Sequence, residues 1–207
     1  YNKFIVIENG INIEKFKRAK PYKKEKINSD FKETDKLICM VGRFSTQKDQ
    51  ATIIKAIKKI PKNIHLLLIG EGKLKEKNKN LAEKLDVLNR IHFLGFRNDI
   101  DKIYKTVDIV VLSSNWEGFG LAALEGMAAG KPVVASNVSG LKKLVQGAGL
   151  LFPRGDDKKL AEKIKNLLSN YDKYKRTSDL CFKRSQLFDI KKMVQRYINE
   201  YKKLNDD

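Results

Sequence analysis

Short continuous runs of apolar residues recur along the chain, and each is closed by glycine or a polar turn. The first run spans Leu37 to Val41 and ends at Gly42. Continuous rather than alternating apolar runs are typical of strands buried on both faces, as in a parallel sheet. The pattern predicts strands over residues 37–41, 65–69, 91–94, 108–112, 132–135 and 150–152.

Segments with apolar residues at helical spacing lie between and after these runs. Ala51, Ile54, Ile57 and Ile60 follow the first run in this way, and Pro61 ends the predicted helix. Helices are predicted over residues 51–60, 74–87, 98–106, 120–130, 140–146, 156–170 and 176–204. This alternation of strands and helices predicts an α/β protein with a doubly wound parallel sheet of about six strands.

The two ends of the chain differ from this alternating part. Residues 4–7 are apolar, which predicts a short strand or linker, and residues 14–36 are polar and Lys-rich, which predicts a loop or linker. We therefore expect three parts. They are a hinge segment and linker over residues 1–36, a ligand-binding domain over 37–170, and C-terminal helices over 171–207 that pack on it.

Composition adds a large basic excess to this pattern. The 207 residues include 43 Lys plus Arg and 25 Asp plus Glu, for a formal net charge of +18. The excess is spread along the chain, and only 8 of the 43 basic residues are Arg. A diffuse, Lys-rich excess is typical of a solvated surface. Attraction to nucleic acid or to anionic lipid headgroups stays open as the alternative.

Several classes of protein do not fit the sequence. It contains no run of 18 apolar residues and no signal-peptide pattern, so we expect neither a spanning helix nor a leader. Cys39 and Cys181 are too few for a disulfide framework or a zinc cluster, and a reducing cytosol is the simplest setting. The P-loop pattern is absent, and a dinucleotide pattern that begins at Gly70 fails because position 75 is Lys.

Ligands of doubly wound sheets bind at the carboxyl ends of the strands, and two loops there carry candidate chemistry. In the first, Arg43 directly follows the strand and Lys48 lies near the start of the next helix. Two cations at this edge suit a diphosphate, Arg as a planar fork and Lys as a point charge. Taken singly, each is better explained as an ordinary solvated side chain.

The second loop follows the fourth predicted strand. Gly118 and Gly120 flank Phe119 where the strand end meets a helix start, so free N–H groups of the first turn can bind an anion. Glu125 lies five residues into this Ala-rich helix, either facing ligand hydroxyl groups or serving as a buried structural acceptor. Glu117, at the mouth of the loop, is a ligand contact or simply a charge that favours the helix dipole.

Together these motifs resemble the C-terminal, donor-binding domain of glycosyltransferase family 4, whose enzymes have the GT-B fold. The matching pieces occur in the family's order and lie within residues 4–170; they are Val6 to Ile11, Val41 to Lys48, Leu66 to Gly72, Phe93 to Phe96 and Ser114 to Val134. Glu117 and Glu125 form the family's E-x7-E pair. The resemblance implies a Rossmann-like α/β domain, one half of a GT-B fold, followed by C-terminal helices.

The resemblance also implies roles for individual residues. Arg43 and Lys48 would neutralise the diphosphate of a nucleotide-sugar, and Glu117 would bind hydroxyl groups of the donor sugar; these three are the catalytic candidates. Glu125 would accept hydrogen bonds from the ribose hydroxyls.

Other matching residues would complete the donor site. Backbone N–H groups from Gly118 to Leu121 would hold sugar and phosphate, and Phe96 and Arg97 would lie beside the base. The full set of donor-binding candidates is Gly42, Gly70, Glu71, Phe96, Arg97, Gly118, Phe119, Gly120, Leu121 and Glu125.

Family members are typically retaining enzymes that need no bound metal. The sequence agrees, because its Asp99 and Asp101 open a predicted helix and leave no Asp-x-Asp motif on a strand-end loop. We therefore expect no cofactor and no metal ligands, with Arg43 and Lys48 supplying positive charge at the leaving diphosphate. The implied activity is that of a hexosyltransferase in bacterial surface polysaccharide or lipopolysaccharide synthesis.

GT-B enzymes have two Rossmann-like domains, and the matching residues correspond to one. We therefore expect a fragment that binds the donor, lacks the N-terminal acceptor-binding domain and is inactive alone. The expected location is cytoplasmic, with attachment to an anionic membrane surface as a further hypothesis and no nucleic acid as partner. The alternatives are another GT-B activity such as a sucrose or glycogen-type synthase, a catalytically silent nucleotide-sugar-binding module, and a basic nucleic-acid-binding domain.

Overall fold

The computed structural model describes residues 4–205, and its centre is a sheet of parallel strands. The strands are β1 (Lys36–Val41), β2 (Ile64–Ile69), β3 (Ile91–Gly95), β4 (Ile109–Leu112), β5 (Val133–Ser136) and β6 (Leu150–Phe152). They lie in the order β3-β2-β1-β4-β5-β6, and every neighbouring pair is parallel. The predicted doubly wound sheet is confirmed, with strand ends within one residue of the prediction.

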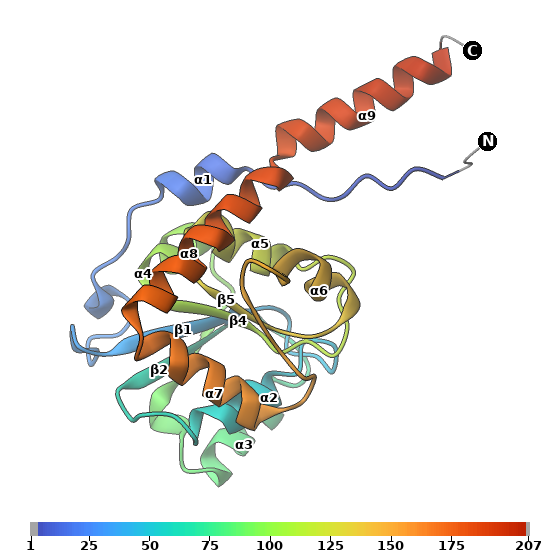
Figure 1. Cartoon of the computed structure of the whole chain (residues 1–207). Coiled ribbons are helices and arrows are strands. Elements are labelled where there is room, and N and C mark those ends of the chain that lie inside the picture. Colours follow the sequence, from blue (N-terminus) through green and yellow to red (C-terminus); the bar gives the residue numbers. More distant parts are fainter. Residues whose placement is uncertain (1–3, 206–207) are drawn as a thin grey trace.

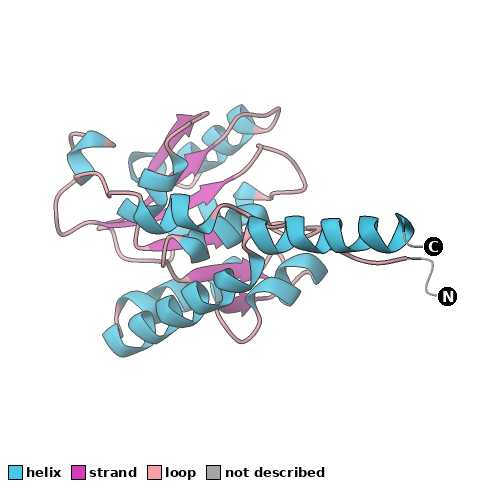
Figure 2. Cartoon of the chain, turned by 90° about the horizontal axis from the view of Figure 1, so that it is seen from above, coloured by secondary structure: helices cyan, strands magenta, loops and turns pink. Residues whose placement is uncertain are grey.

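Helices cover both faces of this sheet (Figure 2). They are α1 (Ile13–Arg18), α2 (Gln50–Ile57), α3 (Lys75–Lys84), α4 (Ile100–Thr106), α5 (Leu121–Ala128), α6 (Ser139–Val145), α7 (Asp157–Leu168), α8 (Tyr171–Ser185) and α9 (Ile190–Asn205). Single 3-10 turns lie at Lys24–Lys26, Leu88–Arg90 and Gln186–Phe188.

The two faces of the sheet form two separate apolar clusters. In β1, Leu37 and Cys39 join the cluster under α1, α4, α5, α6 and α8, whereas Ile38 and Met40 join the one under α2, α3 and α7. Alternate residues of a strand point to opposite faces, so covering both faces requires a continuous apolar run. This is why the strands were recognisable in the sequence.

The order of the strands places a crevice between β1 and β4. From β1 the chain proceeds through β2 to the edge strand β3, and from β4 it proceeds through β5 to the opposite edge at β6. The connections after β1 and β4 therefore leave in opposite directions. In an open parallel sheet this switch point is where a ligand fits between the diverging loops.

The prediction of a loop or linker over residues 14–36 is wrong in part, because α1 covers residues 13–18 and packs on α4 and α5. The side chain of Asn12 caps this helix by accepting a hydrogen bond from the backbone of Lys15, at 3.1 Å. Phe16 is buried, and so is Phe31 farther along the segment. Two isolated aromatic residues in a Lys-rich stretch gave no periodic signal, although they tie the segment to the sheet.

The single helix predicted over residues 176–204 is also wrong, because the structure divides it into α8 and α9. The backbone at the break pairs with a distant segment. Ile11 donates its N–H to the carbonyl of Phe188 at 3.0 Å, and Ile190 donates to the carbonyl of Ile11 at 2.9 Å. Groups used in this bridge are lost to the helical ladder, so the helix ends and restarts.

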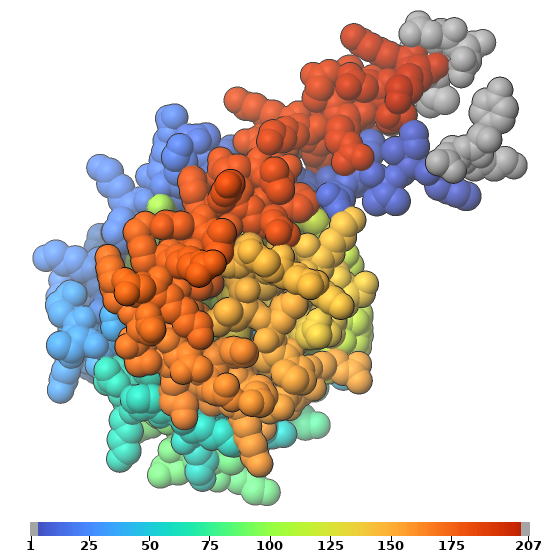
Figure 3. Space-filling view, in the orientation of Figure 1, coloured from blue at the N-terminus to red at the C-terminus, as the bar shows by residue number. Residues whose placement is uncertain are grey.

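After the break, α9 projects from the body with residues 4–10 beside it (Figures 1 and 3). Residues 4–7, predicted as a strand or linker, are extended and belong to no strand of the sheet. Arg196 donates a hydrogen bond to the carbonyl of Val6 at 3.1 Å. Apolar residues of α9 are exposed at helical spacing; they are Ile190, Val194, Tyr197, Ile198 and Tyr201. Over residues 4–205, no helix is long and apolar enough to cross a bilayer.

Candidate functional site

The loops after β1 and β4 are bonded to each other at the switch point. The backbone N–H of Asn115 donates to the carbonyl of Gln47, and its side chain donates to that of Thr46, both at 2.7 Å. Ser113 donates its hydroxyl to the carbonyl of Asp49, also at 2.7 Å. The two loops therefore form one rigid wall rather than two independent flaps.

An ion pair between Lys48 and Glu117 lies where these loops meet. The Lys48 side chain is 20% exposed and that of Glu117 only 7%. Ser114 donates a hydrogen bond to the same carboxylate oxygen of Glu117 at 2.9 Å, and Ser136 fixes Ser114 by donating to its carbonyl at 2.5 Å. The carboxylate is therefore oriented by β4 and β5 while its cation comes from the β1 loop.

Arg43 lies beside this pair and is exposed. Its backbone is held because Gln50 donates its side-chain amide to the Arg43 carbonyl at 3.0 Å. Arg43, Lys48 and Trp116 line one surface pocket of about 460 Å³. The structure thus brings both predicted cations to a single pocket at the carboxyl ends of the strands, with an exposed tryptophan at its edge.

Glycines allow the backbone segments of the site to approach closely. A Cβ on Gly70, where φ is +132°, would lie 2.4 Å from the carbonyl oxygen of Gly42, and one on Gly42 would lie 3.3 Å from the Lys48 side chain. A Cβ on Gly140 would lie 2.3 Å from the carbonyl oxygen of Glu117. Gly140 is an unpredicted part of the site, and it lets α6 approach the β4–α5 loop.

At the start of α5, the groups available to a ligand are backbone atoms rather than side chains. Gly118 is exposed with open space around it, and Gly120 adopts a φ of +97° just before the helix. The ring of Phe119 packs edge-on against Phe188, with centroids 5.2 Å apart, so its side chain is turned toward the body. Leu121, the first helical residue, is exposed. The N–H groups of Leu121 and Ala122 start the helix without a backbone acceptor among the described residues and are available to an anion, whereas that of Ala123 donates to the carbonyl of Gly120 at 3.0 Å.

Glu125 lies on α5, outside the Lys48–Glu117 pair. The hydroxyl of Tyr104 on α4 donates to its carboxylate at 3.4 Å. Burial raises the pKa of Glu125, while the Tyr104 hydrogen bond and the charge of Lys15 on α1 oppose the rise. Glu125 is therefore a partly buried acceptor between three helices, which keeps both readings of it open.

Phe96 and Arg97 follow β3 at the rim of the site. Phe96 is 76% exposed, whereas Arg97 forms a two-point ion pair with Asp99 at 2.8 and 2.6 Å. Hydrogen bonding from Arg97 lowers the pKa of Asp99 to about 2, and the hydroxyl of Tyr22 adds a further hydrogen bond at 2.8 Å. We did not predict Asp99 or Tyr22 as partners of Arg97, although an Arg-x-Asp spacing before a helix was a usable local signal.

Glu71, another predicted donor-binding residue, forms a separate ion pair. Glu71 is exposed and pairs with Lys75 one turn later, at 3.0 and 3.2 Å. Ser114, which holds Glu117, was not predicted as a site residue. Its position three residues before Glu117 on the same loop was the available signal.

Nowhere in the described part of the chain do three His, Cys, Asp or Glu side chains gather so that they could hold a metal ion.

The chain is similar to glycosyltransferases in sequence and in fold. The family model described as "Glycosyl transferases group 1" matches residues 22–180. An uncharacterized glycosyltransferase of Methanocaldococcus jannaschii is 39% identical over 153 residues, which cover 70% of this chain and 39% of the relative. The Escherichia coli enzyme UDP-Gal:alpha-D-GlcNAc-diphosphoundecaprenol alpha-1,3-galactosyltransferase is 38% identical over 152 residues, with the same two coverages.

A solved structure resembles the whole described fold. The crystal structure of Anabaena Alr3699/HepE in complex with UDP and glucose superposes with a TM-score of 0.87 at 26% identity, covering 96% of this chain and 56% of that one. The chain therefore spans about two fifths of the length of the two relatives named above and little more than half of this structural neighbour.

Proposed function

Because the chain belongs to the group 1 glycosyl transferases, whose structures have the GT-B fold, we propose that it is the donor-binding half of a retaining hexosyltransferase. It would bind a nucleotide-diphosphate-sugar with no metal or other cofactor and present the sugar to an acceptor. The observation that carries the proposal is the pocket at the switch point, where Arg43 lies beside the Lys48–Glu117 pair.

When the donor binds, Lys48 and Glu117 would each exchange the other for a group of the ligand. A diphosphate entering the pocket offers Lys48 a second anion, and the exposed guanidinium of Arg43 can engage it from the other side. Glu117 then gains free acceptor capacity for hydroxyl groups of the donor sugar, while Ser114 keeps its carboxylate oriented. As the bond to the diphosphate breaks, negative charge grows on the leaving group, and cations already in place stabilise it.

The remaining donor contacts are assigned on the same basis. Glu125 would accept hydrogen bonds from the ribose, and the exposed Phe96 with the fixed Arg97 would lie beside the base. Backbone N–H groups from Gly118 to Leu121 would hold the phosphate and sugar oxygens. Gly42, Gly70 and Glu71 would shape the wall under the diphosphate. Binding of UDP and glucose by the Anabaena protein supports a uridine nucleotide as the first donor to test.

The acceptor would bind outside these 207 residues. The chain spans 39% of the Escherichia coli relative, and the apolar residues of α9 are exposed to solvent. We expect a second, acceptor-binding domain to pack near this helix and the chain alone to bind donor without transferring sugar. The name of that relative, with its lipid-linked acceptor, supports work on polysaccharide or lipopolysaccharide precursors at the cytoplasmic face of an anionic membrane.

Nucleotide binding by the 207-residue chain tests the proposal directly. Calorimetric titration with UDP, GDP and ADP should reveal saturable binding of at least one. Arg43→Ala should weaken that binding about tenfold or more, because it removes charge-assisted hydrogen bonds to the diphosphate. The matched control is Arg176→Ala on α8, an exposed arginine that should leave the affinity unchanged. Absence of binding by all three nucleotides would contradict the proposal.

A further inference from the structure

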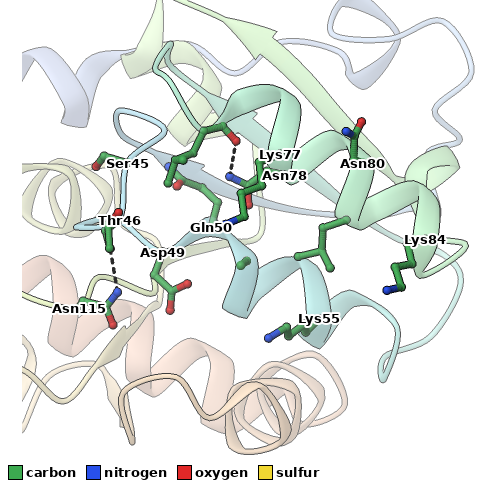
Figure 4. A pocket seen from close by; sticks show the side chains of 13 residues that line it. Ser45, Thr46, Asp49, Gln50, Lys55, Lys77, Asn78, Asn80, Lys84 and Asn115 are labelled. Carbon is green, nitrogen blue, oxygen red and sulfur yellow. Dashed lines mark hydrogen bonds between the residues drawn. The ribbon is translucent and has the colours of Figure 1, made fainter.

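A second pocket, of about 520 Å³, opens between α2 and α3 (Figure 4). Its volume lies within the range of about 300–1,000 Å³ that is usual for small-molecule sites. It shares Ser45 and Thr46 with the first pocket but contains none of the three catalytic candidates. The β1–α2 loop therefore forms a wall common to two separate cavities.

A buried amide in this pocket has an unused acceptor. Gln50 is only 2% exposed, and its Nε2 donates to the carbonyl of Arg43. Because a carbonyl can only accept, this bond fixes which end of the amide is oxygen. The oxygen, Oε1, is buried and accepts no hydrogen bond from any residue in the described range. Buried polar atoms are normally paired, and a hydroxyl donor in the pocket that Gln50 lines would reach this oxygen after a small shift of the side chains that cover it.

Cations surround the same opening. Lys55 comes from α2 and Lys77 and Lys84 from α3, and within residues 4–205 none of the three pairs with a carboxylate (Figure 4). The one lining carboxylate, Asp49, accepts a hydrogen bond from the hydroxyl of Thr52 at 2.5 Å. Three cations and one anion give the pocket a formal charge of +2, which favours an anionic ligand.

Buried and exposed amides add hydrogen-bonding groups suited to hydroxyls. Asn78 is buried and donates its Nδ2 to the carbonyl of Leu74 at 2.8 Å, so its own carbonyl remains as an acceptor. Asn80 and Asn115 also line the cavity. The amide acceptors of Gln50 and Asn78 and the surrounding lysines together match a molecule that carries several hydroxyl donors and at least one negative charge.

We propose that the α2–α3 pocket is a second ligand site, for a small sugar that carries a phosphate or a carboxylate group. Its hydroxyl groups would donate to Gln50 and Asn78, and its anionic group would meet the lysines of α2 and α3. A neutral sugar leaves the cations unmatched. Inorganic phosphate matches the cations but is too small to reach the amides as well.

Calorimetric titration of the 207-residue chain distinguishes these ligands. The probes are glucose 6-phosphate, glucuronate, glucose and inorganic phosphate. At least one of the two acidic sugars should bind at least about tenfold more tightly than glucose and inorganic phosphate, and the better of the two identifies the anionic group. The double variant Lys55→Gln/Lys84→Gln should lower that affinity about tenfold, whereas Lys62→Gln, an exposed lysine on the α2–β2 turn, should not.

A further variant and a competing nucleotide separate this site from the donor site. Lys48→Met should leave the affinity for the acidic sugar unchanged, and UDP should not displace it. No saturation with either acidic sugar up to about 10 mM would overturn the proposal. So would equal affinity for inorganic phosphate, which indicates an ion site only, or competitive displacement by UDP, which indicates binding at the donor pocket. Each readout remains valid if the chain fails to bind any nucleotide.

Discussion

The two ends of the parallel sheet both bury polar side chains, but only one end leaves its groups available to a ligand. At the amino end, Asn28 donates to Nδ1 of His92 at 3.1 Å, which places the proton of a neutral His92 on Nε2. That nitrogen then donates to Nδ1 of His65 at 3.2 Å. The ring of Phe31 packs edge-on against both imidazoles, with centroids 5.1 and 4.7 Å away. This network is closed by the chain's own side chains.

At the carboxyl end the comparable network is open. Lys48 and Glu117 pair where two loops meet, and Lys48 also lines a pocket together with the exposed Arg43. Buried polar side chains alone therefore do not identify a functional site. A network that completes its own hydrogen bonds stabilises the fold, whereas one that borders a cavity can exchange partners with a ligand. Substitutions at the two ends should therefore have separable effects on stability and on nucleotide affinity.

The largest effect should come from Gly140→Ala, which tests whether the open end depends on close backbone approach. The added Cβ would lie 2.3 Å from the carbonyl oxygen of Glu117 and 2.7 Å from backbone atoms of Gly118. Because backbone atoms cannot rotate away, we expect a loss of about 3 kcal/mol in the free energy of unfolding, together with loss of UDP binding. The control Gly118→Ala, which meets open space, should change stability by less than about 0.5 kcal/mol. Equal unfolding midpoints for both variants in urea would show that α6 can move aside freely.

The next largest effect should come from Lys48→Met, which tests whether Lys48 exchanges Glu117 for the diphosphate. It leaves the carboxylate of Glu117 without its cation at 7% exposure, so the free energy of unfolding should fall by about 1–3 kcal/mol. UDP affinity should fall about tenfold or more. Adding Glu117→Gln removes the unpaired charge, and the double variant should recover stability without recovering UDP affinity. If stability and affinity return together, Lys48 acts only by holding Glu117.

Lowering the pH should reduce folding stability through the two histidines at the amino end of the sheet. Burial lowers the pKa of His65, and burial together with the charge of His65 lowers that of His92 to about 4, from 6.5. The unfolded chain then binds more protons below pH 6.5, so stability should fall as the pH drops from 6.5 toward 4. Urea unfolding across this range should show the loss, and His65→Gln/His92→Gln should flatten it while leaving UDP affinity at pH 7 unchanged. Asp99, with a pKa of about 2, loses its contribution only below its usual 3.8, outside this range.

The sequence allowed the open end to be predicted far better than the closed one. Strand-end glycines and charges such as Arg43 and Lys48 lie in short segments whose place on the sheet follows from the strand pattern. The Lys48–Glu117 pair itself joins residues 69 positions apart, and no local pattern encodes which partner a charge selects. The contact of Phe31 with the two histidines could not be predicted for the same reason, because one aromatic residue in a polar stretch acquires its role only when three segments meet.

The smallest effect should come from Phe96→Ala, which tests whether the exposed Phe96 ring contacts the base of the nucleotide. Phe96 is 76% exposed and contributes nothing to the two apolar clusters, so its truncation should change the free energy of unfolding by less than about 0.5 kcal/mol. Base–aromatic stacking is worth about 1–3 kcal/mol in nucleic-acid sites, and a single exposed ring beside the base should give the lower end, a loss of several-fold in UDP affinity. Phe96→Tyr, which keeps a stacking ring, should restore the affinity. If alanine leaves UDP affinity unchanged, the Phe96 ring makes no stacking contact with the base.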